Sequence, residues 1–399
     1  MIRWVTLILL ALTACADSGG NGRPTVILWH TYTGAEEIAL ENIVSAANRD
    51  QDRYRIEPVF VPYEAFADKI TNAIPNGNGP DLFIFAHDRI GDWAESGFIE
   101  PIEFYVDDDL ADHYAYAAIS AMAYRGSLFG LPMAVKSVAL FYRTDLCPVP
   151  PKTTGELFEW GHGFVASHPG AYALAYSNID LYGHAPWLHG FGGRIFAKDG
   201  TLDVASPEGV RAAAFARRLR TEKLVPANAT GDVIGTLFNA KKTALAISGP
   251  WFIAGINDTV PWRVATLPVV TETGLAAAPF LGVEGVLMSS RADHKGLAFS
   301  AMRALTSDAS AAERARRARQ IVPNNAAYEN PDIAADPVLT AFRAQLSHTV
   351  AMPKTPAMRM VWTPYETALG RVIQSGDDPG AALSRAEDEI RGYVRRRSN

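Results

Sequence analysis

The stretch Asn76–Ile102, NGNGPDLFIFAHDRIGDWAESGFIEPI, carries the clearest signals of fold and function in this chain. It opens with the turn sequence NGNGP and continues into the apolar run Leu82–Ala86, which predicts a short buried strand. The polar triplet His87-Asp88-Arg89 follows where this strand should end. In an open α/β sheet the ligand crevice lies outside the carboxyl ends of the strands. An aromatic residue, an acid and a base at that edge can stack on a ligand and hydrogen-bond its hydroxyls. The alternative is an ordinary strand end with a solvated ion pair.

Strand and helix signals alternate before this stretch. The runs at 24–29 and 54–61 predict strands, and the segments at 35–48 and 62–74 predict helices. A β-α-β-α-β order indicates a largely parallel, doubly wound sheet. Tyr32 and Thr33 follow the first strand and are candidate crevice residues. Glu64 is either a ligand contact or an acid that stabilises the first turn of its helix.

The N-terminus has the pattern of a secreted, lipid-anchored protein. Arg3 precedes an apolar segment, Trp4–Leu12, that is too short to span a bilayer. The sequence Leu12-Thr13-Ala14-Cys15 resembles a bacterial lipobox, in which cleavage precedes a cysteine that is then lipidated. We expect a signal peptide at 1–14, lipid on Cys15 and a flexible tether at 15–23. A plain secretory leader with an incidental cysteine is the alternative.

Size and composition indicate two domains of an ordinary globular protein. A chain of 399 residues is too long for one simple core. The net charge is −6 with no strongly basic face, which argues against a nucleic-acid partner. Eight tryptophans, several of them beside glycine or proline, are typical of clefts lined with aromatic side chains.

The stretch at 76–102 closely resembles the corresponding segment of the maltose-type sugar-binding proteins of bacterial ABC transporters. Three further segments match that family in the same order along the chain. They are Asn178–Tyr182 upstream of Phe191-Gly192-Gly193, Ile247-Ser248-Gly249-Pro250-Trp251, and Met352-Pro353 with Trp362 downstream.

The resemblance implies ligand contacts from each of these segments. It assigns a strand-end aromatic, an acid and an arginine to Phe85, Asp88 and Arg89. It also assigns stacking tryptophans to Trp251 and Trp362, and an acid and a tyrosine to Asp180 and Tyr182. Sugar rings suit such a site because their C–H faces are apolar and their hydroxyl edges are polar.

Two positions depart from the family pattern. Phe85 stands where the maltose-type motif usually has tryptophan, which leaves a smaller stacking surface. Lys136 stands where that group has an acid, and it either contacts the ligand or forms a salt bridge. Glu284, in a second predicted crossover, is a candidate partner for it and a candidate ligand contact. These changes weaken any claim that the ligand is maltose.

No enzymatic motif is evident. The chain has no G-x-S-x-G, no G-x-x-x-x-G-K-[ST] and no H-E-x-x-H. His184 and His189 have no cysteine or tight acid cluster nearby, so we expect neither a metal site nor a cofactor. A glycosidase pair of carboxylates cannot be recognised from sequence.

The family resemblance implies a two-lobe periplasmic-binding-protein fold, each lobe a doubly wound, mostly parallel sheet flanked by helices. We expect the chain to cross between lobes near Lys136, near Leu281 and around Tyr328–Pro337. The N-terminal lobe would then comprise 24–135 and 282–332, and the C-terminal lobe 136–281 and 333–399.

The same resemblance implies a sugar receptor that is not an enzyme. We expect a monomer at the periplasmic or cell surface that delivers a di- or oligosaccharide to ABC permease subunits. The alternatives are a receptor for an anionic solute such as a glycerol phosphate, and a secreted glycosidase.

Overall fold

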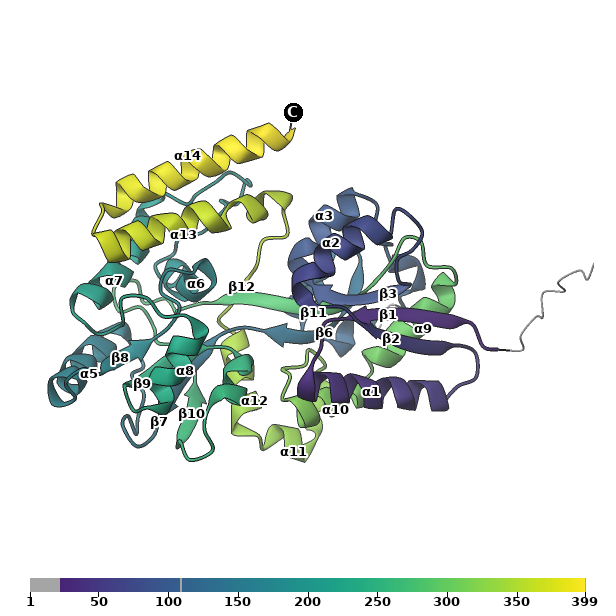
Figure 1. The fold of residues 1–399 in the computed structure, drawn as a ribbon, viewed down its shortest axis with the longest axis horizontal. Coiled ribbons are helices and arrows are strands. Elements are labelled where there is room, and N and C mark those ends of the chain that lie inside the picture. The colour runs from purple at the N-terminus through teal and green to yellow at the C-terminus, as the bar shows by residue number, and fades with distance from the viewer. Residues whose placement is uncertain (1–21, 108–109, 399) are drawn as a thin grey trace, which may run out of the picture.

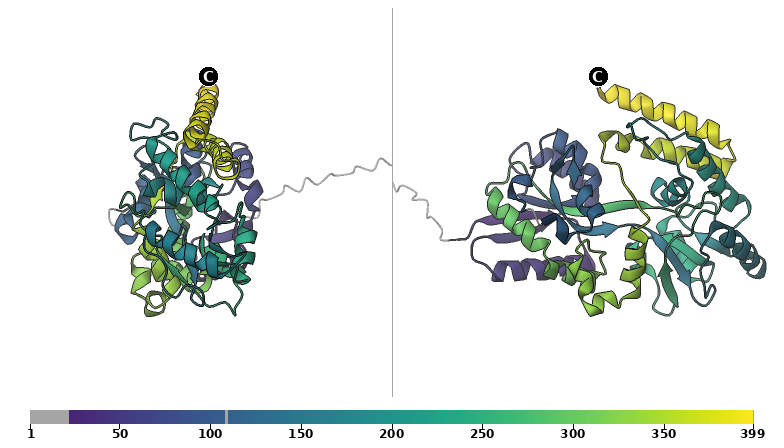
Figure 2. Two further views of the ribbon diagram at one scale, coloured as in Figure 1. Left: turned by 90° about the vertical axis from the view of Figure 1, so that its left-hand side faces the viewer. Right: turned by 180° about the vertical axis from the view of Figure 1, so that it is seen from behind.

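Two α/β lobes lie side by side, and the long strands β6 (Gly130–Lys136) and β11 (Phe280–Met288) run between them (Figures 1 and 2). The computed structural model describes residues 22–107 and 110–398. The predicted leader, Cys15 and most of the tether lie outside these residues. The two-lobe α/β architecture agrees with the sequence-based expectation.

The first lobe is built on a six-stranded sheet in the order β12-β11-β3-β1-β2, with β6 also paired to β11. Its remaining strands are β1 (Thr25–His30), β2 (Arg55–Phe60), β3 (Leu82–Ala86) and β12 (Val350–Ala351). Strand β1 runs parallel to β2 and β3, whereas β11 runs antiparallel to β3 and β6. A small hairpin of β4 (Ala123–Tyr124) and β5 (Ser127–Leu128) lies apart from this sheet.

Helices flank this sheet, and buried aliphatic and aromatic side chains fill the space between them. They are α1 (Gly34–Arg49), α2 (Tyr63–Ala73), α3 (Ile90–Glu95), α4 (Tyr116–Ala121), α9 (Lys295–Leu305) and α10 (Asp308–Ala318). Because β1 and β3 run parallel, their carboxyl ends meet at one edge of the sheet. That edge faces the second lobe (Figure 1).

The second lobe has a four-stranded sheet in the order β10-β7-β9-β8. Its strands are β7 (Ala139–Arg143), β8 (Tyr172–Ala175), β9 (Thr243–Ser248) and β10 (Trp262–Ala265). Strands β8 and β9 pair in parallel, whereas β7, which follows β6 of the first lobe, runs antiparallel to both of its neighbours. Both sheets are therefore mixed.

Helices of the second lobe pack around this sheet and above it. They are α5 (Thr154–Ser167), α6 (Leu181–Gly190), α7 (Pro207–Thr221), α8 (Gly231–Asn239), α13 (Trp362–Gly370) and α14 (Pro379–Ser398). Short α11 (Pro331–Ala334) and α12 (Pro337–Leu346) follow α10, and α12 packs against β10 and β7. The chain thus returns to the second lobe between α10 and α12.

A late segment links the lobes again. The Lys354 ammonium donates to the backbone carbonyls of Ser120 and Ala123 in the first lobe. Nearby, Arg359 Nη1 lies 3.0 Å from Asp92 Oδ2 on α3. The chain then enters α13 and α14 of the second lobe, so this strap contacts both lobes.

Buried Arg143 fastens α8 to the end of β7. Its Nη1 donates to the Phe238 carbonyl at 2.7 Å, and its Nε and Nη2 donate to both Asp145 oxygens at 3.0 and 2.9 Å. Two parallel bonds of this kind are among the strongest polar contacts in proteins. Hydrogen bonding from Arg143 holds the pKa of Asp145 at about 2.

Asp145→Asn should lower stability in an acid-dependent way. The carboxylate has a depressed folded-state pKa, so its contribution is complete above its ordinary pKa of about 3.9 and is lost as pH falls towards 2. At pH 7 the variant should lose on the order of 2 kcal/mol, because a buried arginine loses charged acceptors.

Thermal denaturation between pH 7 and pH 2 measures this effect. The control is Asp50→Asn, which removes an exposed partner of Arg49 and should change little. Equal melting temperatures for wild type and Asp145→Asn at pH 7 would contradict the assignment.

Candidate functional site

Glu284 stands at an irregular point of β11, between the two lobes. The pairing register of β11 with β6 shifts between Glu284 and Gly285. A Cβ at 285 would come within 2.9 Å of the Leu131 backbone oxygen, in addition to overlapping the Met122 side chain, so glycine is required there. Irregularities of this kind turn a side chain away from its regular direction and often occur beside functional sites.

Two polar side chains hold the Glu284 carboxylate. Lys136 Nζ, at the end of β6, donates to Oε1 at 2.7 Å, and the Tyr32 hydroxyl donates to Oε2 at 3.2 Å. Glu284 is only 8% exposed, so this carboxylate is held away from bulk water. Lys136 therefore forms the salt bridge with Glu284 that its sequence position left open.

These contacts set the charge of the site. Burial acts to lower the pKa of Lys136, but Glu284 and Glu36 outweigh it, and the pKa lies above its ordinary value. Burial, with the nearby Glu284 charge, raises the pKa of Tyr32 well above normal. At neutral pH the lysine is therefore a cation and the tyrosine a neutral donor.

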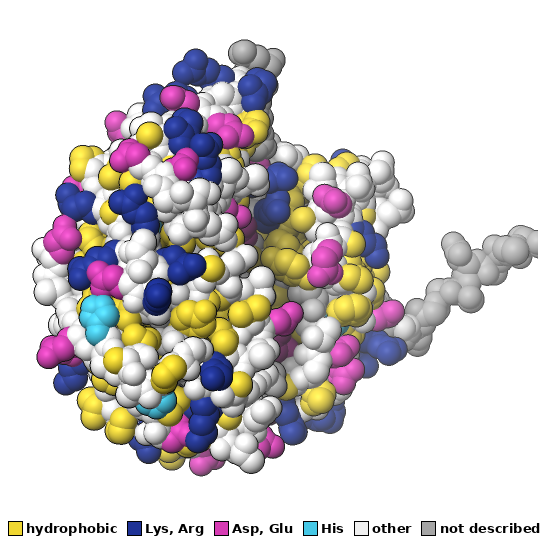
Figure 3. Space-filling view, turned by 60° about the vertical axis from the view of Figure 1, so that its left-hand side comes forward, with side chains coloured by type: hydrophobic (Ala, Val, Ile, Leu, Met, Phe, Trp, Pro, Cys, Tyr) yellow, Lys and Arg dark blue, Asp and Glu magenta, His cyan; other side chains and the backbone are white. Residues whose placement is uncertain are grey.

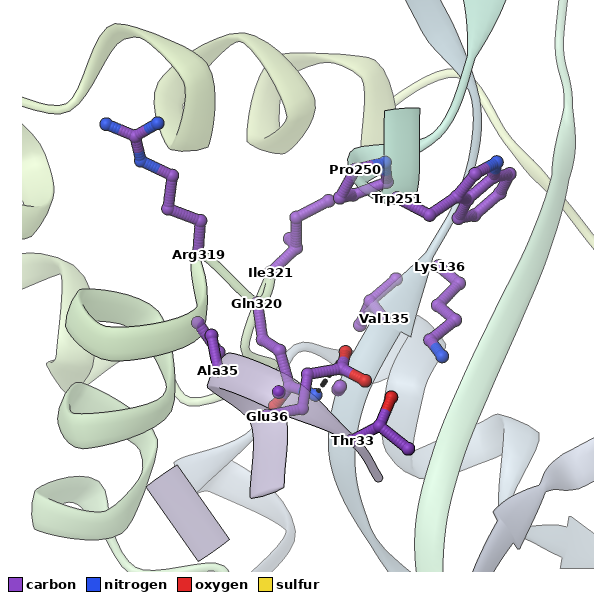
Figure 4. Close-up of a pocket in the computed structure, with 13 residues that line it drawn as sticks. Thr33, Ala35, Glu36, Val135, Lys136, Pro250, Trp251, Arg319, Gln320 and Ile321 are labelled. Carbon is purple, nitrogen blue, oxygen red and sulfur yellow. Dashed lines mark hydrogen bonds between the residues drawn. The ribbon is translucent and has the colours of Figure 1, made fainter. Parts of the chain in front are cut away.

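A cavity of about 440 Å³ opens beside this network and between the lobes (Figures 3 and 4). The first lobe contributes Thr33–Glu36 and Ala134–Lys136, and the second contributes Pro250 and Trp251. The segment 318–321, which follows α10, forms another wall. The size suits a small molecule, since such sites span roughly 300–1,000 Å³.

Glu36 and Gln320 join two of these walls. Gln320 Nε2 donates to Glu36 Oε1 at 2.9 Å (Figure 4). Sequence analysis missed both residues. Glu36 could have been predicted from the sequence, because it lies in the first turn of the helix that follows the Tyr32–Thr33 loop. Gln320 could not, since only the fold brings Gln320 beside Glu36.

Trp251 supplies the aromatic surface of this cavity. Its side chain is 53% exposed although it is large and apolar. The indole folds back over its own chain, because a Cβ at Gly249 would overlap the ring. Tyr182 lies near it, with ring centroids 6.2 Å apart. Gly249 therefore permits the orientation of Trp251.

A second exposed aromatic ring lies on the first lobe. Phe85 is 5% exposed and is sandwiched between Phe66 and Tyr63, at centroid distances of 5.0 and 5.5 Å. Tyr63 is the outer ring of this stack and is 60% exposed. Sequence analysis chose Phe85 and missed Tyr63, which presents the accessible face.

Asp88 and Arg89 follow β3 in the short helical turn η1 (His87–Arg89). Asp88 Oδ2 and Arg89 Nε are 4.0 Å apart, and both side chains are about a third exposed. Burial raises the pKa of Asp88 in spite of the opposing arginine charge. Burial raises the pKa of Tyr63 above its ordinary value, and the charges of Asp88, Lys136, Glu284 and Arg89 also act on its hydroxyl.

The other predicted residues have structural environments of their own. Asp180 accepts from Gly183 N at 3.0 Å and caps α6. Trp362 packs partly buried against the second-lobe core, in the same cluster as Tyr182. Glu64 is exposed in the first turn of α2. Of the predicted ligand-binding residues, Thr33, Lys136 and Trp251 line the cavity, and the others do not. The ligand contacts of all of them stay predictions.

Within residues 22–107 and 110–398, no three His, Cys, Asp or Glu side chains are grouped so as to bind a metal ion. No helix in the same described part of the chain combines the length and hydropathy needed to cross a membrane.

Residues 42–341 match the family described as bacterial extracellular solute-binding protein. The chain belongs to this family. The maltotriose-binding protein of Pyrococcus abyssi is 28% identical over 381 residues, which cover 93% of this chain and 82% of that protein. The galactooligosaccharide-binding protein of Bacillus subtilis is 26% identical over 409 residues, covering 97% and 95%.

Solved structures of maltodextrin- and maltotriose-binding proteins are similar to this fold. A cyclo/maltodextrin-binding protein complexed with maltotetraose has a TM-score of 0.84 at 29% identity, covering 94% of this chain and 98% of its own. The maltotriose-binding protein of Thermus thermophilus, bound with maltotriose, has a TM-score of 0.79 at 26% identity, with coverages of 92% and 100%. These likenesses confirm the predicted two-lobe fold and the resemblance to maltose-type solute-binding proteins.

Gly249→Ala should displace the Trp251 indole without unfolding this solute-binding protein. The new methyl group collides with a side chain and not with backbone, so the ring can swing away. We expect a shift in the Trp251 contribution to the fluorescence spectrum, isolated by subtracting the spectrum of Trp251→Phe. The melting temperature should change by only a few degrees.

Gly163→Ala is the control, because a Cβ there meets nothing within 4 Å. An unchanged Trp251 difference spectrum in Gly249→Ala would show that this glycine does not set the ring orientation.

Proposed function

We propose that this chain is the extracytoplasmic substrate-binding protein of an ABC sugar importer, and that it binds a di- or oligosaccharide of the maltose or maltodextrin type. The observation that carries the proposal is the pairing of opposite surfaces across one cavity. A half-exposed indole, Trp251, lies on the second lobe, while Glu36 lies on the first and Lys136 lies at the end of β6, where the chain leaves the first lobe.

Sugar chemistry explains why these surfaces belong together. The C–H face of a pyranose is apolar and stacks on an aromatic ring, whereas its hydroxyl edge needs donors and acceptors. Trp251 and Tyr63 offer aromatic faces on opposite lobes. The first-lobe polar groups include a fixed ammonium and carboxylates, so they can both donate to hydroxyls and accept from them. The named relatives, which bind maltotriose and galactooligosaccharides, support this ligand class.

The site lies between lobes, which suggests how binding is signalled. We propose that the lobes close about the hinge strands around the sugar, and that the closed monomer delivers it to membrane permease subunits. A ligand favours closure only through contacts it makes better in the closed form, and a site split between two lobes meets that condition. Affinity should be about micromolar or tighter, about −8 kcal/mol.

The remaining predictions complete this proposal. Lipid on Cys15 would hold the protein at the periplasmic or cell surface, with 15–23 as the tether. The lobes would be 24–135 with 282–332, and 136–281 with 333–399. Strand β11 itself crosses the boundary, because its residues 280 and 281 pair with β12 and its residues 282–287 pair with β6, so it links the two lobes.

Binding without catalysis suits the same geometry. A transport receptor must release its ligand unchanged, so it needs neither a nucleophile nor a cofactor. The named relatives are binding proteins. Recovery of an oligosaccharide in its original length after prolonged incubation distinguishes this proposal from a secreted glycosidase.

Calorimetric titration with maltose, maltotriose and a galactooligosaccharide tests the proposal. We expect saturable binding of at least one, and Trp251→Ala should weaken it by about tenfold to a hundredfold, as expected for a buried aromatic anchor. Phe104→Ala is the matched control, because Phe104 is an aromatic ring 92% exposed outside the cavity. Equal losses in both variants would show that Trp251 does not contact the sugar.

Salt dependence separates a neutral sugar from an anionic solute. Glu284 already balances the Lys136 charge at 2.7 Å, which leaves little net attraction for a phosphate. We therefore expect sugar affinity to change less than about twofold between 50 and 500 mM NaCl, and glycerol phosphate to bind weakly or not at all. Tight, salt-sensitive binding of glycerol phosphate would reverse the choice of ligand.

A further inference from the structure

His87 is the buried member of the polar triplet that follows β3. Its side chain is only 1% exposed, whereas Asp88 and Arg89 are each about a third exposed. Burying an imidazole is costly unless its ring nitrogens have hydrogen-bond partners. The contacts of this ring therefore show what the buried position is for.

The His87 ring extends the pairing of β3 with β11. The antiparallel ladder between these strands ends at Glu284 and Ala86, because the chain turns into η1 one residue later. Next to this last pair, Val283 N donates to Nδ1 of His87 at 3.1 Å. A buried backbone N–H without an acceptor is costly, so the imidazole takes the place of a backbone carbonyl.

This bond fixes β11 directly beside Glu284. On the β6 side, the pairing register shifts between Glu284 and Gly285, so that edge alone does not fix the carboxylate. On the other side, the bond from Val283 holds the preceding residue. The carboxylate must reach both Lys136 and Tyr32, at 2.7 and 3.2 Å. Because it lies several bonds from the backbone, a small rotation of the strand at 283 would change both distances.

The same ring faces the strap between the lobes, where the Met352 backbone and the Lys354 charge act on it. Burial and the Lys354 ammonium lower the pKa of His87 to about 4, so the ring is neutral at pH 7. Because Val283 N donates to Nδ1, the neutral ring carries its proton on Nε2. Protonation would place a second hydrogen on Nδ1, opposite the Val283 N–H, and remove the acceptor.

We infer that His87 is a positioning residue of the sugar site, whose neutral imidazole holds β11 at Val283 and thereby sets the place of the Glu284 carboxylate. It acts through the strand and does not touch the ligand. The inference rests on the proposed function where it concerns sugar affinity, and on the fold alone where it concerns the strand.

Calorimetric titration with maltotriose at pH 7 compares wild type with two variants of His87. His87→Leu keeps an apolar body of similar size without an acceptor, so affinity should fall about tenfold, as expected for a buried donor left unpaired. In His87→Asn the side-chain Oδ1 can accept from Val283 N, and most of the loss should be recovered. His162→Leu, at a half-exposed histidine on α5, is the control and should bind as wild type does.

A double-mutant cycle with Glu284→Gln separates positioning from a general structural role. In that background His87→Leu should weaken binding by less than about twofold, because the carboxylate that it positions is already gone. Melting temperatures confirm that each variant is folded. Independent, fully additive losses would overturn the inference.

The pH dependence of affinity gives another readout. Wild type should lose affinity as pH falls towards 4, and His87→Asn, which has no titrating group at 87, should lose less. The elements packed against the ring carry other charged groups, which are Asp88 and Arg89 on its own turn, Asp92 on α3, Glu284 on β11, and Lys354 and Arg359 on the strap. These groups are common to both proteins, so the difference between the profiles belongs to His87. Identical profiles would contradict the inference.

Amide hydrogen exchange at Val283 decides the matter without any sugar. The amide should be protected in wild type and in His87→Asn, and should exchange at least about tenfold faster in His87→Leu. Unchanged protection in His87→Leu would show the inference to be wrong and leave the proposed function standing. If wild type does not bind maltotriose but the leucine variant releases this amide, the proposed ligand is wrong and the positioning of β11 by His87 stands.

Discussion

The hydrogen bonds of the buried Glu284 carboxylate with Lys136 and Tyr32 are the interaction on which the hinge and the site both depend. Strand β11 pairs with β12 at its start and with β6 and β3 further along, so it holds segments that are far apart in the sequence in one sheet. A carboxylate at its irregular point would be costly without partners. Lys136 and Tyr32 supply them, from the ends of β6 and of the β1 loop. The charge network thereby ties three chain segments together where the ligand cavity begins.

Placing this network at a hinge has a functional consequence. The cation and its carboxylate neutralise one another in the absence of ligand, which avoids an uncompensated buried charge. Their remaining hydrogen-bonding capacity can then be directed at a neutral, hydroxyl-rich molecule. The second lobe offers mainly an aromatic surface by contrast. A ligand with one apolar face and one polar edge gains most when the lobes enclose it, which is the differential contact that closure needs.

Departures from the family pattern become understandable in three dimensions. A phenylalanine at 85 reduces the stacking surface on its own strand, but Tyr63 from α2 covers its ring and presents an exposed face one layer further out. The lysine at 136 gains its acid from Glu284, far away in the sequence. At position 85 an aromatic face is still presented, by Tyr63, and at position 136 a carboxylate is still present, from Glu284. Specificity is then expected to differ within the same fold.

The sequence by itself determined the alternation of strands and helices, the family, and the positions where strands end in polar or aromatic residues. These signals are local, because apolar periodicity and turn residues act over a few positions. Trp251 beside Gly249-Pro250 was recognisable for the same reason.

Only the tertiary structure decided which of these residues meet. It paired Lys136 with Glu284, joined Glu36 to Gln320, buried Phe85 beneath Tyr63, and placed the His87 ring against Val283. Such contacts join segments that are far apart along the chain. Their geometry depends on how two sheets pack about a shared strand, and no local pattern records that packing.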